Sequence, residues 1–468
     1  MKSIILEKDL EILRLTQENA ELKAENKSLK ADLVQLSAQV SKFEKAIEIF
    51  KVKKDSHNSS LPPSKEIVKS NQSLRTKSDK KRGGQIGHKG HSLKMTATPD
   101  QIVPLEPDYC NICGNDLSTV SAQLNSRRQE IEIPPIIPIY IEYQSMSKLC
   151  SCGHLQVGNF PEHITNHIQY GASVQATVAY ESTRQYTPFQ RLSEKMASLF
   201  NLPLSQGTIR NMLHNMAQKA KPVYNEIQKR LEKSIVVGGD ESGVKVGGKN
   251  WWAWVFQNKL LTFIAIVATR GMAAVDVLFK DGFANAILVS DRWRAQLNTF
   301  AKGHQLCMAH LMRDLVYLIE LEKTPWAIKV KDLLVMALAL KKQLTVYNDS
   351  NIEVQQIEQT MNLLLSEELF KDKTPKTLVF QRALKKNRDY LFPFLYYDYV
   401  PPDNNGSERA VRNIKVKQKV SGQFNGGQED FAILRSVIDT VIKNSGNVFE
   451  TLKLIANCKN TTIFDVAE

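Results

Sequence analysis

Apolar side chains near the start of the chain follow a strict seven-residue repeat. Leucine or phenylalanine occupies one position of every heptad from Leu15 to Phe50. A seam of period 3.5 predicts a coiled coil over residues 1–52, because such a seam would drift around the surface of a single helix packed on its own protein. The other seam position holds Ile12, Asn19, Asn26, Leu33, Val40 and Ile47.

The two asparagines in this seam predict how the helix associates. A buried Asn at such a position pairs best with its twin in a parallel dimer, and it gives up stability for register. Glu18 and Glu25 also occupy positions that face Lys23 and Lys30 of a partner helix. We therefore expect a homodimer or a higher oligomer to form through this segment.

From residue 234 the pattern changes to short apolar runs separated by turn signals. These runs predict four strands, and the first three form a meander with turns near residues 247 and 257. A helix is expected over residues 272–279, before the fourth strand. Residues 311 to about 399 then read as a long helical stretch. The pattern predicts an α/β region followed by a long helical region.

Three acidic residues in this part of the chain are candidate metal ligands. Asp240 ends the first predicted strand and Asp291 ends the fourth, so their carboxylates meet at one rim if these strands are neighbours. Such oxygens suit Mg²⁺, although Asp at strand ends is also common without a metal. Glu408 follows an Asn-Asn-Gly-Ser cap in the first turn of a helix. Basic residues of that helix, expected to contact phosphates, are Arg409, Arg412, Lys415 and Lys419.

Residues 188–218 predict two helices joined by a short turn. The first spans 188–199 and the second runs from 206 to about 218. This arrangement fits a DNA-binding helix-turn-helix, and it fits an ordinary helical bundle equally well. In the first case Arg210, Asn211 and His214 would face the DNA groove.

The charge balance narrows the choice of partner. The 468 residues carry 62 Lys and Arg against 49 Asp and Glu, which gives a net charge of +13 and favours an anionic partner. The longest apolar stretch, residues 260–268, is far shorter than the ~20 residues of a membrane span. The charged first residues also differ from a secretory signal. We expect a cytoplasmic protein of several domains with no membrane partner.

A basic segment follows the predicted coiled coil. Residues 51–94 hold 12 Lys and Arg against three Asp and Glu among many Ser, Pro and Gly, so this segment does not fold alone. We interpret residues 53–100 as a flexible arm along DNA phosphates, in which Lys81, Arg82 and Lys89 make contacts. A solvated tether is the simpler interpretation, and the two are compatible.

Two cysteine pairs predict a small zinc-binding module over residues 101–165. Cys110 and Cys113 have the usual knuckle spacing, and Cys150 and Cys152 are one residue closer together. Four thiolates can close a tetrahedral zinc site, and His154 is an alternative to one cysteine of the tighter pair. Buried free thiols are the other interpretation.

A series of motifs follows one order along nearly the whole chain. After the zipper come NSSLPPSKE, RGGQIGHKGH, the cysteine module, GGDESGVKVGGKNWWAWVF, LVSDRW, HQLCMAHLMRDL, DNNGSERAVRNIKVKQKVSGQF and LRSVIDT. In these motifs the chain resembles the transposases of the insertion sequence 66 family, which belong to the RNase H-like DDE class. The departures are small, with Ser242 where the family more often has Thr and with the narrow second cysteine pair.

The resemblance implies an activity and a set of site residues. Asp240, Asp291 and Glu408 would form the catalytic triad and hold two Mg²⁺ ions, with Mn²⁺ as an alternative. The expected reaction is cleavage at transposon ends followed by strand transfer to target DNA. A family signature of unclear role, Cys307-x-x-His310-x-x-Arg313, follows the second acid, and we favour packing or DNA contact for it.

The expected partners are double-stranded DNA at the transposon ends and the target, a second copy of the chain and accessory proteins of the same element. The expected location is the nucleoid in a bacterial cytoplasm. Two rival interpretations are a non-catalytic DNA-binding protein that keeps the transposase fold, and a coiled-coil scaffold that binds RNA. Further predicted regions are a helix-turn-helix-like domain (166–232), an RNase H-like core (233–310 and 400–445), a helical insertion (311–399) and a C-terminal tail (446–468).

Overall fold

The computed structural model describes residues 2–51, 58, 87–90, 92–348, 350–370 and 374–458. They divide into two compact units, one within 1–72, 159–192 and 206–468 and the other within 73–158 and 193–205. Of the predicted arm contacts, Lys81 and Arg82 lie outside the described residues, and Lys89 is exposed. None of the described helices is both long and apolar enough to span a bilayer.

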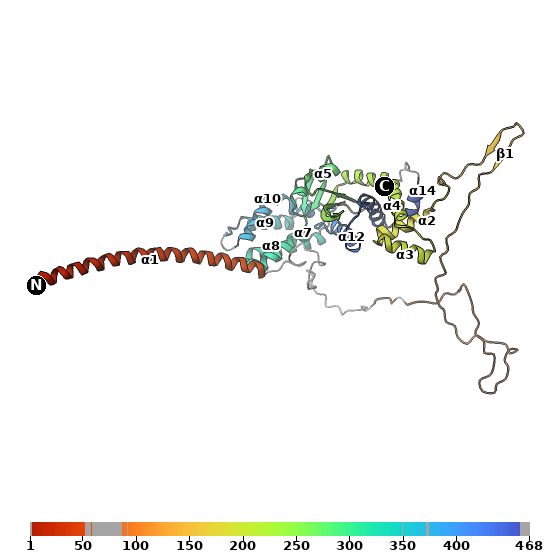
Figure 1. Cartoon of the computed structure of the whole chain (residues 1–468), viewed down its shortest axis with the longest axis horizontal. Coiled ribbons are helices and arrows are strands. Elements are labelled where there is room, and N and C mark those ends of the chain that lie inside the picture. The colour runs from red at the N-terminus through yellow and green to blue at the C-terminus, as the bar shows by residue number, and fades with distance from the viewer. Residues whose placement is uncertain are drawn as a thin grey trace. The chain divides into compact units, whose positions relative to one another are not determined.

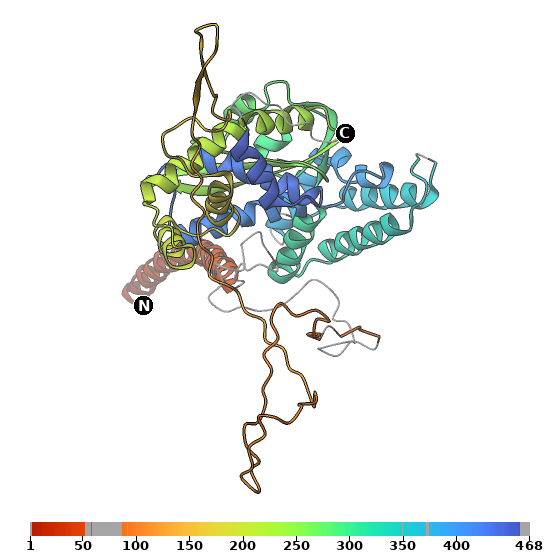
Figure 2. The same cartoon turned by 90° about the vertical axis from the view of Figure 1, so that its right-hand side faces the viewer.

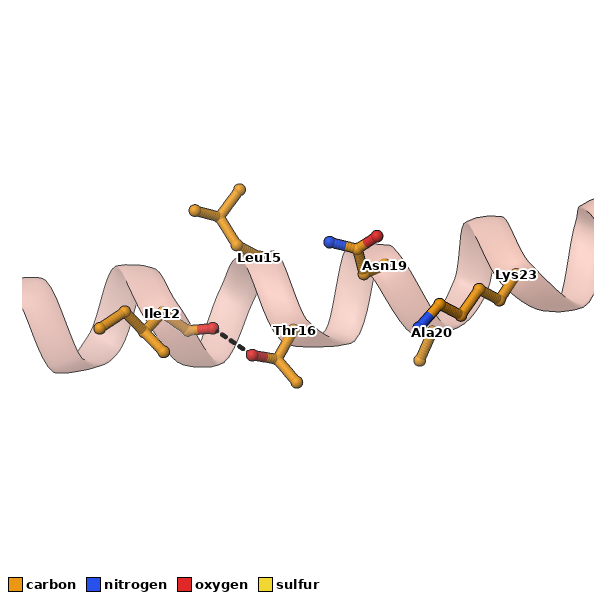
Figure 3. A pocket seen from close by; sticks show the side chains of 6 residues that line it. All are labelled: Ile12, Leu15, Thr16, Asn19, Ala20 and Lys23. Carbon is orange, nitrogen blue, oxygen red and sulfur yellow. Dashed lines mark hydrogen bonds between the residues drawn. The ribbon is translucent and has the colours of Figure 1, made fainter.

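The N-terminal segment forms one continuous helix, α1 (Lys2–Lys51), shown in red in Figure 1. Its described apolar seam residues between Ile12 and Phe43 are all at least half exposed. Figure 3 shows part of this surface, where Ile12, Leu15 and Asn19 line a shallow hollow along the helix. The helix is therefore confirmed, and its pairing as a coiled coil stays a prediction.

A five-stranded mixed sheet forms the centre of the larger unit. The strand order is β5-β4-β3-β6-β7, in which β3, β4 and β5 are antiparallel and β6 and β7 run parallel to β3. The predicted meander and the neighbouring first and fourth strands are confirmed. The strands are β3 (Val236–Val246), β4 (Lys249–Gln257), β5 (Thr262–Val267), β6 (Phe283–Ser290) and β7 (Ala301–Leu306).

Helices cover both faces of this sheet. On one face, Val244, Val255 and Ile264 pack against α12 (Asn405–Ser421) and the start of α13 (Gln428–Lys443). In Figure 2 these C-terminal helices, in blue, cross in front of the green strands. Alternate residues of the strands point to the opposite face. There Phe256 and Phe263 contact Phe279, which follows α5 (Met272–Leu278), and Phe263 also stacks on Tyr224 of α4 (Gln206–Glu232).

Helix α13 also protects the edge of the sheet. The backbone N–H groups of Thr262 and Ile264 on the edge strand β5 donate to the hydroxyl oxygens of Thr440 and Ser436, at 3.1 and 2.9 Å. Unpaired N–H groups on an edge strand are a site for pairing with another chain. Two hydroxyl side chains at helical spacing therefore satisfy this edge inside the same chain.

The stretch predicted as helical between residues 311 and 399 is mostly helical in its described residues, where several helices are joined by short non-helical segments. Its core contains Trp326, whose indole N–H donates to Leu364 O at 2.6 Å, and it continues into Ile287 and Leu306 of the sheet. The helices are α7 (Met308–Glu322), α8 (Pro325–Gln343), α9 (Ile352–Ser366), α10 (Pro375–Lys386), a 3-10 turn (Arg388–Tyr390) and α11 (Pro393–Tyr396).

The two helices predicted over residues 188–218 are present, with a different length for the second. They are α3 (Phe189–Phe200) and α4, which continues to Glu232 because its buried positions recur at helical spacing past Pro222. The segment predicted as a C-terminal tail contains α14 (Val448–Asn457), which packs on α2 (Ala172–Ala179).

We predict that Gly238→Ala destabilises the sheet. An added Cβ at residue 238 would lie 2.5 Å from Asn404 Oδ1 and 2.9 Å from Ser407 Oγ, both of which are buried. Overpacking of this kind should lower the free energy of unfolding by about 1–3 kcal/mol, measured by urea denaturation. Gly243→Ala on the same strand is the matched control, because the nearest atom there is 3.6 Å away. Equal stability of the two variants would contradict the prediction.

Candidate active site

The strand register places Asp240 beside Asp291. The parallel pairing of β3 with β6 ends with Gly238 opposite Val289, and each acid lies two residues further along the chain. Asp291 directly follows β6, as predicted. The prediction that Asp240 ends its strand is wrong, because β3 continues to Val246 in antiparallel pairing with β4 after its pairing with β6 has stopped.

Glu408 reaches the same rim from α12. It lies in the first turn of this helix, which packs on the sheet face that also carries Asp240. Burial raises the pKa of Asp240 well above its usual value, and the negative charges of Glu241, Asp291 and Glu408 raise it further. The three predicted carboxylates therefore lie close enough to interact electrostatically, but within the described residues their oxygens do not all lie within 4.8 Å of one another.

The neighbouring Glu241 has a different environment. Strand alternation sends its side chain to the opposite face, where its carboxylate is 2% exposed and lies 2.9 Å from Arg270 Nη2. The guanidinium of Arg270 stacks on two indole rings, at 4.6 Å from the Trp252 centroid and 3.7 Å from that of Trp293. Glu241 is thus held by a cation that is itself fixed, which leaves Asp240 as the acid directed at α12.

A cavity of about 210 Å³ opens beside Asp291. The Asp291 carboxylate accepts the backbone N–H of Trp293 at 2.7 Å, which fixes its orientation at the edge of this space. Arg292 lines the cavity and forms an ion pair with Asp314. Carboxylate, guanidinium, indole and imidazole groups therefore line one small cavity, whose residues are Asp291, Arg292, Trp293, His310 and Asp314.

The signature residues of unclear role lie next to the third acid. Arg313 Nη1 is 3.4 Å and His310 Nδ1 is 3.7 Å from Glu408 Oε1. The ligand atoms of Cys307, His310 and Glu408 all lie within 4.8 Å of one another, a spacing at which a metal ion could be held. Burial lowers the pKa of His310 and raises that of Cys307 to about 12, so both side chains favour their neutral forms.

Sequence reasoning missed Asn404, which links the elements that carry the three acids. Its side-chain Nδ2 donates to Gly239 O at 2.5 Å, and its Oδ1 accepts from Ser407 Oγ at 2.6 Å. Its backbone N–H donates to Cys307 Sγ at 3.2 Å, and the Cys307 N–H donates to Ser290 O at 2.8 Å. The only sequence signal was the Asp-Asn-Asn-Gly-Ser run, which indicated a cap and not a tie to the sheet.

The basic residues predicted on α12 divide into two groups. Arg409, Arg412 and Lys419 are exposed. Lys415 is half-buried, and its Nζ donates to Gly243 O on β3. The first group is free to meet a large anion such as DNA, whereas Lys415 also ties its helix to the sheet.

Among the predicted groove-facing residues of α4, two lie against other elements of the same unit. His214 Nδ1 is 3.1 Å from Asp430 Oδ1, at the start of α13. Arg210 is exposed, and its guanidinium lies close to the backbone of Gly426. Asn211 is exposed. DNA reading by this helix stays a prediction.

The cysteine pairs of the smaller unit each form a tight turn. Gly114 N–H donates to Cys110 O at 2.9 Å, and Gly153 N–H donates to Cys150 O at 2.8 Å. The second turn joins β1 (Ser147–Leu149) to β2 (Leu155–Val157) and carries Cys152. The thiols of each pair are neighbours, but within the described residues the two pairs do not meet in one four-thiol group.

Comparison with known proteins gives two family matches. A family of unknown function, DUF6444, matches residues 10–94. A search of curated proteins finds no match. The model of the transposase IS66 family matches residues 167–429, which is more than half of the chain and includes all three clustered acids, and the chain therefore belongs to the transposase IS66 family.

Proposed function

We propose that this transposase cleaves the ends of its element and joins them to target DNA at Asp240, Asp291 and Glu408. The observation that carries the proposal is the electrostatic interaction of three acids that are far apart in sequence, since Asp291 and Glu408 both raise the pKa of Asp240. An intact set of this kind gives no support to the non-catalytic alternative. The reaction is a hydrolysis of one phosphodiester bond followed by a transesterification, in which the freed 3′ hydroxyl attacks the target strand.

The donor set fits divalent metal ions. Burial and three neighbouring negative charges disfavour the ionised form of Asp240, and a cation bound between the acids would reverse this penalty. Carboxylate oxygens are hard ligands, so two Mg²⁺ ions, or Mn²⁺ in their place, suit Asp240, Asp291 and Glu408. When bound, such ions activate a water and neutralise charge on the departing oxygen.

The protein groups around these acids orient them and meet the DNA. The Glu241 N–H donates to Asp240 Oδ1 at 2.9 Å, and Arg313 lies beside Glu408. Exposed Arg409 and Arg412 follow Glu408 on the same helix, where they would contact substrate phosphates. The carboxylates therefore hold the ions, and the neighbouring guanidinium groups balance the charge of the DNA backbone.

We further propose that the core is RNase H-like. The proposal is supported by a three-stranded antiparallel meander whose first strand, β3, also pairs in parallel with β6, which in turn pairs in parallel with β7. The position of the acids on β3, after β6 and on α12 supports it as well. The core would comprise 233–310 and 400–445, with the helices of 311–399 as an insertion.

The remaining regions have proposed roles in binding and assembly. The exposed seam of α1 would pair with a second copy, because a long apolar stripe of heptad spacing is best covered by an identical helix. Residues 53–100, with net positive charge, would follow DNA phosphates, and the segment 166–232 would contact DNA through Arg210. Accessory proteins of the same element are further partners. Pairing of two chains would hold two transposon ends in one assembly.

The cysteine unit is proposed to bind one structural zinc ion. Both pairs already lie on Gly-ended turns, and closure needs the two turns to approach each other. Cys110, Cys113, Cys150 and Cys152 would be the ligands, with His154 in place of one cysteine as the alternative.

We predict that Asp240→Asn, Asp291→Asn and Glu408→Gln each abolish DNA cleavage and leave DNA binding largely intact. The loss should exceed the roughly 10- to 100-fold that changes in outer-shell residues cost, because each variant removes a metal ligand. Cleavage is measured on a duplex that carries the element's own end, with Mg²⁺ and with EDTA. Glu367→Gln, which removes an ion-paired carboxylate in the helical region, is the matched control. Cleavage that survives all three changes would refute the assignment.

We also predict that Asp240→Asn stabilises the metal-free protein. The raised pKa of Asp240 means that the folded state binds this proton more tightly than the unfolded chain, so stability falls as pH rises through the raised pKa. In EDTA, the Tm of the variant should exceed that of the wild type at pH 8, and the difference should shrink towards pH 4. A lower Tm for the variant than for the wild type at pH 8 would contradict the prediction that the Asp240 carboxylate destabilises the metal-free protein.

For the cysteine unit we predict about one zinc ion per chain, measured by mass spectrometry of the purified protein. Cys113→Ser should lose this zinc and expose residues 101–165 to limited proteolysis. Cys458→Ser is the control, because this cysteine follows α14 in the other unit. A protein that folds normally and holds no zinc would favour free thiols.

A further inference from the structure

Two buried residues, Asn404 and Cys307, connect the three chain segments that carry the acids. The contacts of these residues end one position before Asp240, at Gly239 O, and one position before Asp291, at Ser290 O. The third segment is reached through the helix itself, because Asn404 O accepts the backbone N–H of Glu408 at 3.2 Å. Each acid is therefore within a few bonds of one hydrogen-bonded network.

The position of Asn404 requires a side chain that both donates and accepts a hydrogen bond, and an amide does both. Its amide donates to Gly239 O and at the same time accepts from Ser407 Oγ, so both ends of the side chain are used. An aspartate would turn the first contact into a repulsion between two oxygens. Asn404 is 3% exposed, and a Cβ added to Gly238 would lie 2.5 Å from its Oδ1. The missing side chain of Gly238 thus leaves the space in which the Asn404 amide lies.

Cys307 acts in this network as a hydrogen-bond acceptor. Its thiol is 1% exposed and accepts the Asn404 N–H, while burial holds its pKa near 12 and keeps it neutral. A thiol sulfur is a weak acceptor, and the 3.2 Å separation brings the Asn404 N–H within hydrogen-bond distance of it. Because the Cys307 thiol already accepts this hydrogen bond, we do not assign it as a metal ligand. The ligand atoms of Cys307, His310 and Glu408 nevertheless lie close enough to one another to hold a metal ion. A thiophilic metal is the competing outcome in the test below.

We infer that Asn404 and Cys307 are positioning residues that set the spacing of Asp240, Asp291 and Glu408. The inference rests on the proposed function, because spacing matters only if the three acids share metal ions. Loss of either contact would keep the fold that carries the acids but allow the distances between the acids to change. The expected defect is weaker metal binding in a folded protein, and not a loss of fold.

The test compares Asn404→Ala, Asn404→Asp, Cys307→Ala and Cys307→Ser in the full chain. Gln381→Ala is the matched control, because Gln381 is also a buried amide, and it donates to two backbone carbonyls of the helical segment, Leu364 O and Glu367 O, and not to the segments that carry the acids. The rate of DNA cleavage is measured against Mg²⁺ and Mn²⁺ concentration, together with DNA binding, Tm and bound zinc.

Three of these variants, Asn404→Ala, Asn404→Asp and Cys307→Ala, should raise the Mg²⁺ concentration for half-maximal cleavage by at least about tenfold, with partial recovery in Mn²⁺. Cys307→Ser, which keeps an acceptor, should be affected less. Gln381→Ala should lower the Tm without changing the metal requirement.

Unchanged Mg²⁺ dependence in folded variants would overturn the inference and leave the proposed function intact. Zinc that is bound by the wild type and lost equally in Cys307→Ala and Cys307→Ser would also overturn it, in favour of a metal ligand. A wild-type chain that does not cleave would instead refute the proposed function.

Discussion

The hydrogen bonds of Asn404 are the constraint on which the rest of the site depends. A buried amide that loses its partners costs about 1–3 kcal/mol, so the docked position of α12 is the one in which both ends of this side chain are satisfied. Because Glu408 lies in the first turn of the same helix, its distance from β3 follows from that docking. The glycine at 238 completes the arrangement by leaving room for the amide.

The electrostatics of the site oppose this packing. Asp240, Asp291 and Glu408 repel one another, and the positive groups nearby are committed elsewhere, since Arg270 binds Glu241 and Arg292 binds Asp314. Arg313 beside Glu408 offsets the repulsion only in part. Burial and repulsion between the carboxylates therefore cost stability at Asp240. The contacts of Phe256 and Phe263 with Phe279, and the hydrogen bonds of α13 to β5, stabilise the sheet that carries Asp240.

Sequence patterns could predict the elements that follow from local alternation of apolar residues and from helix caps. They predicted little of what depends on pairing between strands that are distant in sequence. The meander and the helix that carries Glu408 follow from local signals. Strand β7 could not be predicted, because Lys302, His304 and Gln305 interrupt any apolar run and the strand is defined by its pairing with β6. The middle position of Asp240 in β3 also depends on a partner strand. The role of Asn404 was hidden because its contacts lie 165 and 97 residues away.

The same network explains how a helical segment of this size can separate the second and third acids. The chain leaves the site at Cys307 and returns at Asn404, and these two ends are bonded to each other through Asn404 N to Cys307 Sγ and Met308 N to Pro402 O. The segment between them is a loop with pinned ends, whose closure cost grows only slowly with length. Its helices pack around Trp326 in a core that also includes Ile287 and Leu306 of the sheet. The two bonded ends and the shared core therefore keep Cys307 and Asn404 next to each other, however many residues lie between them.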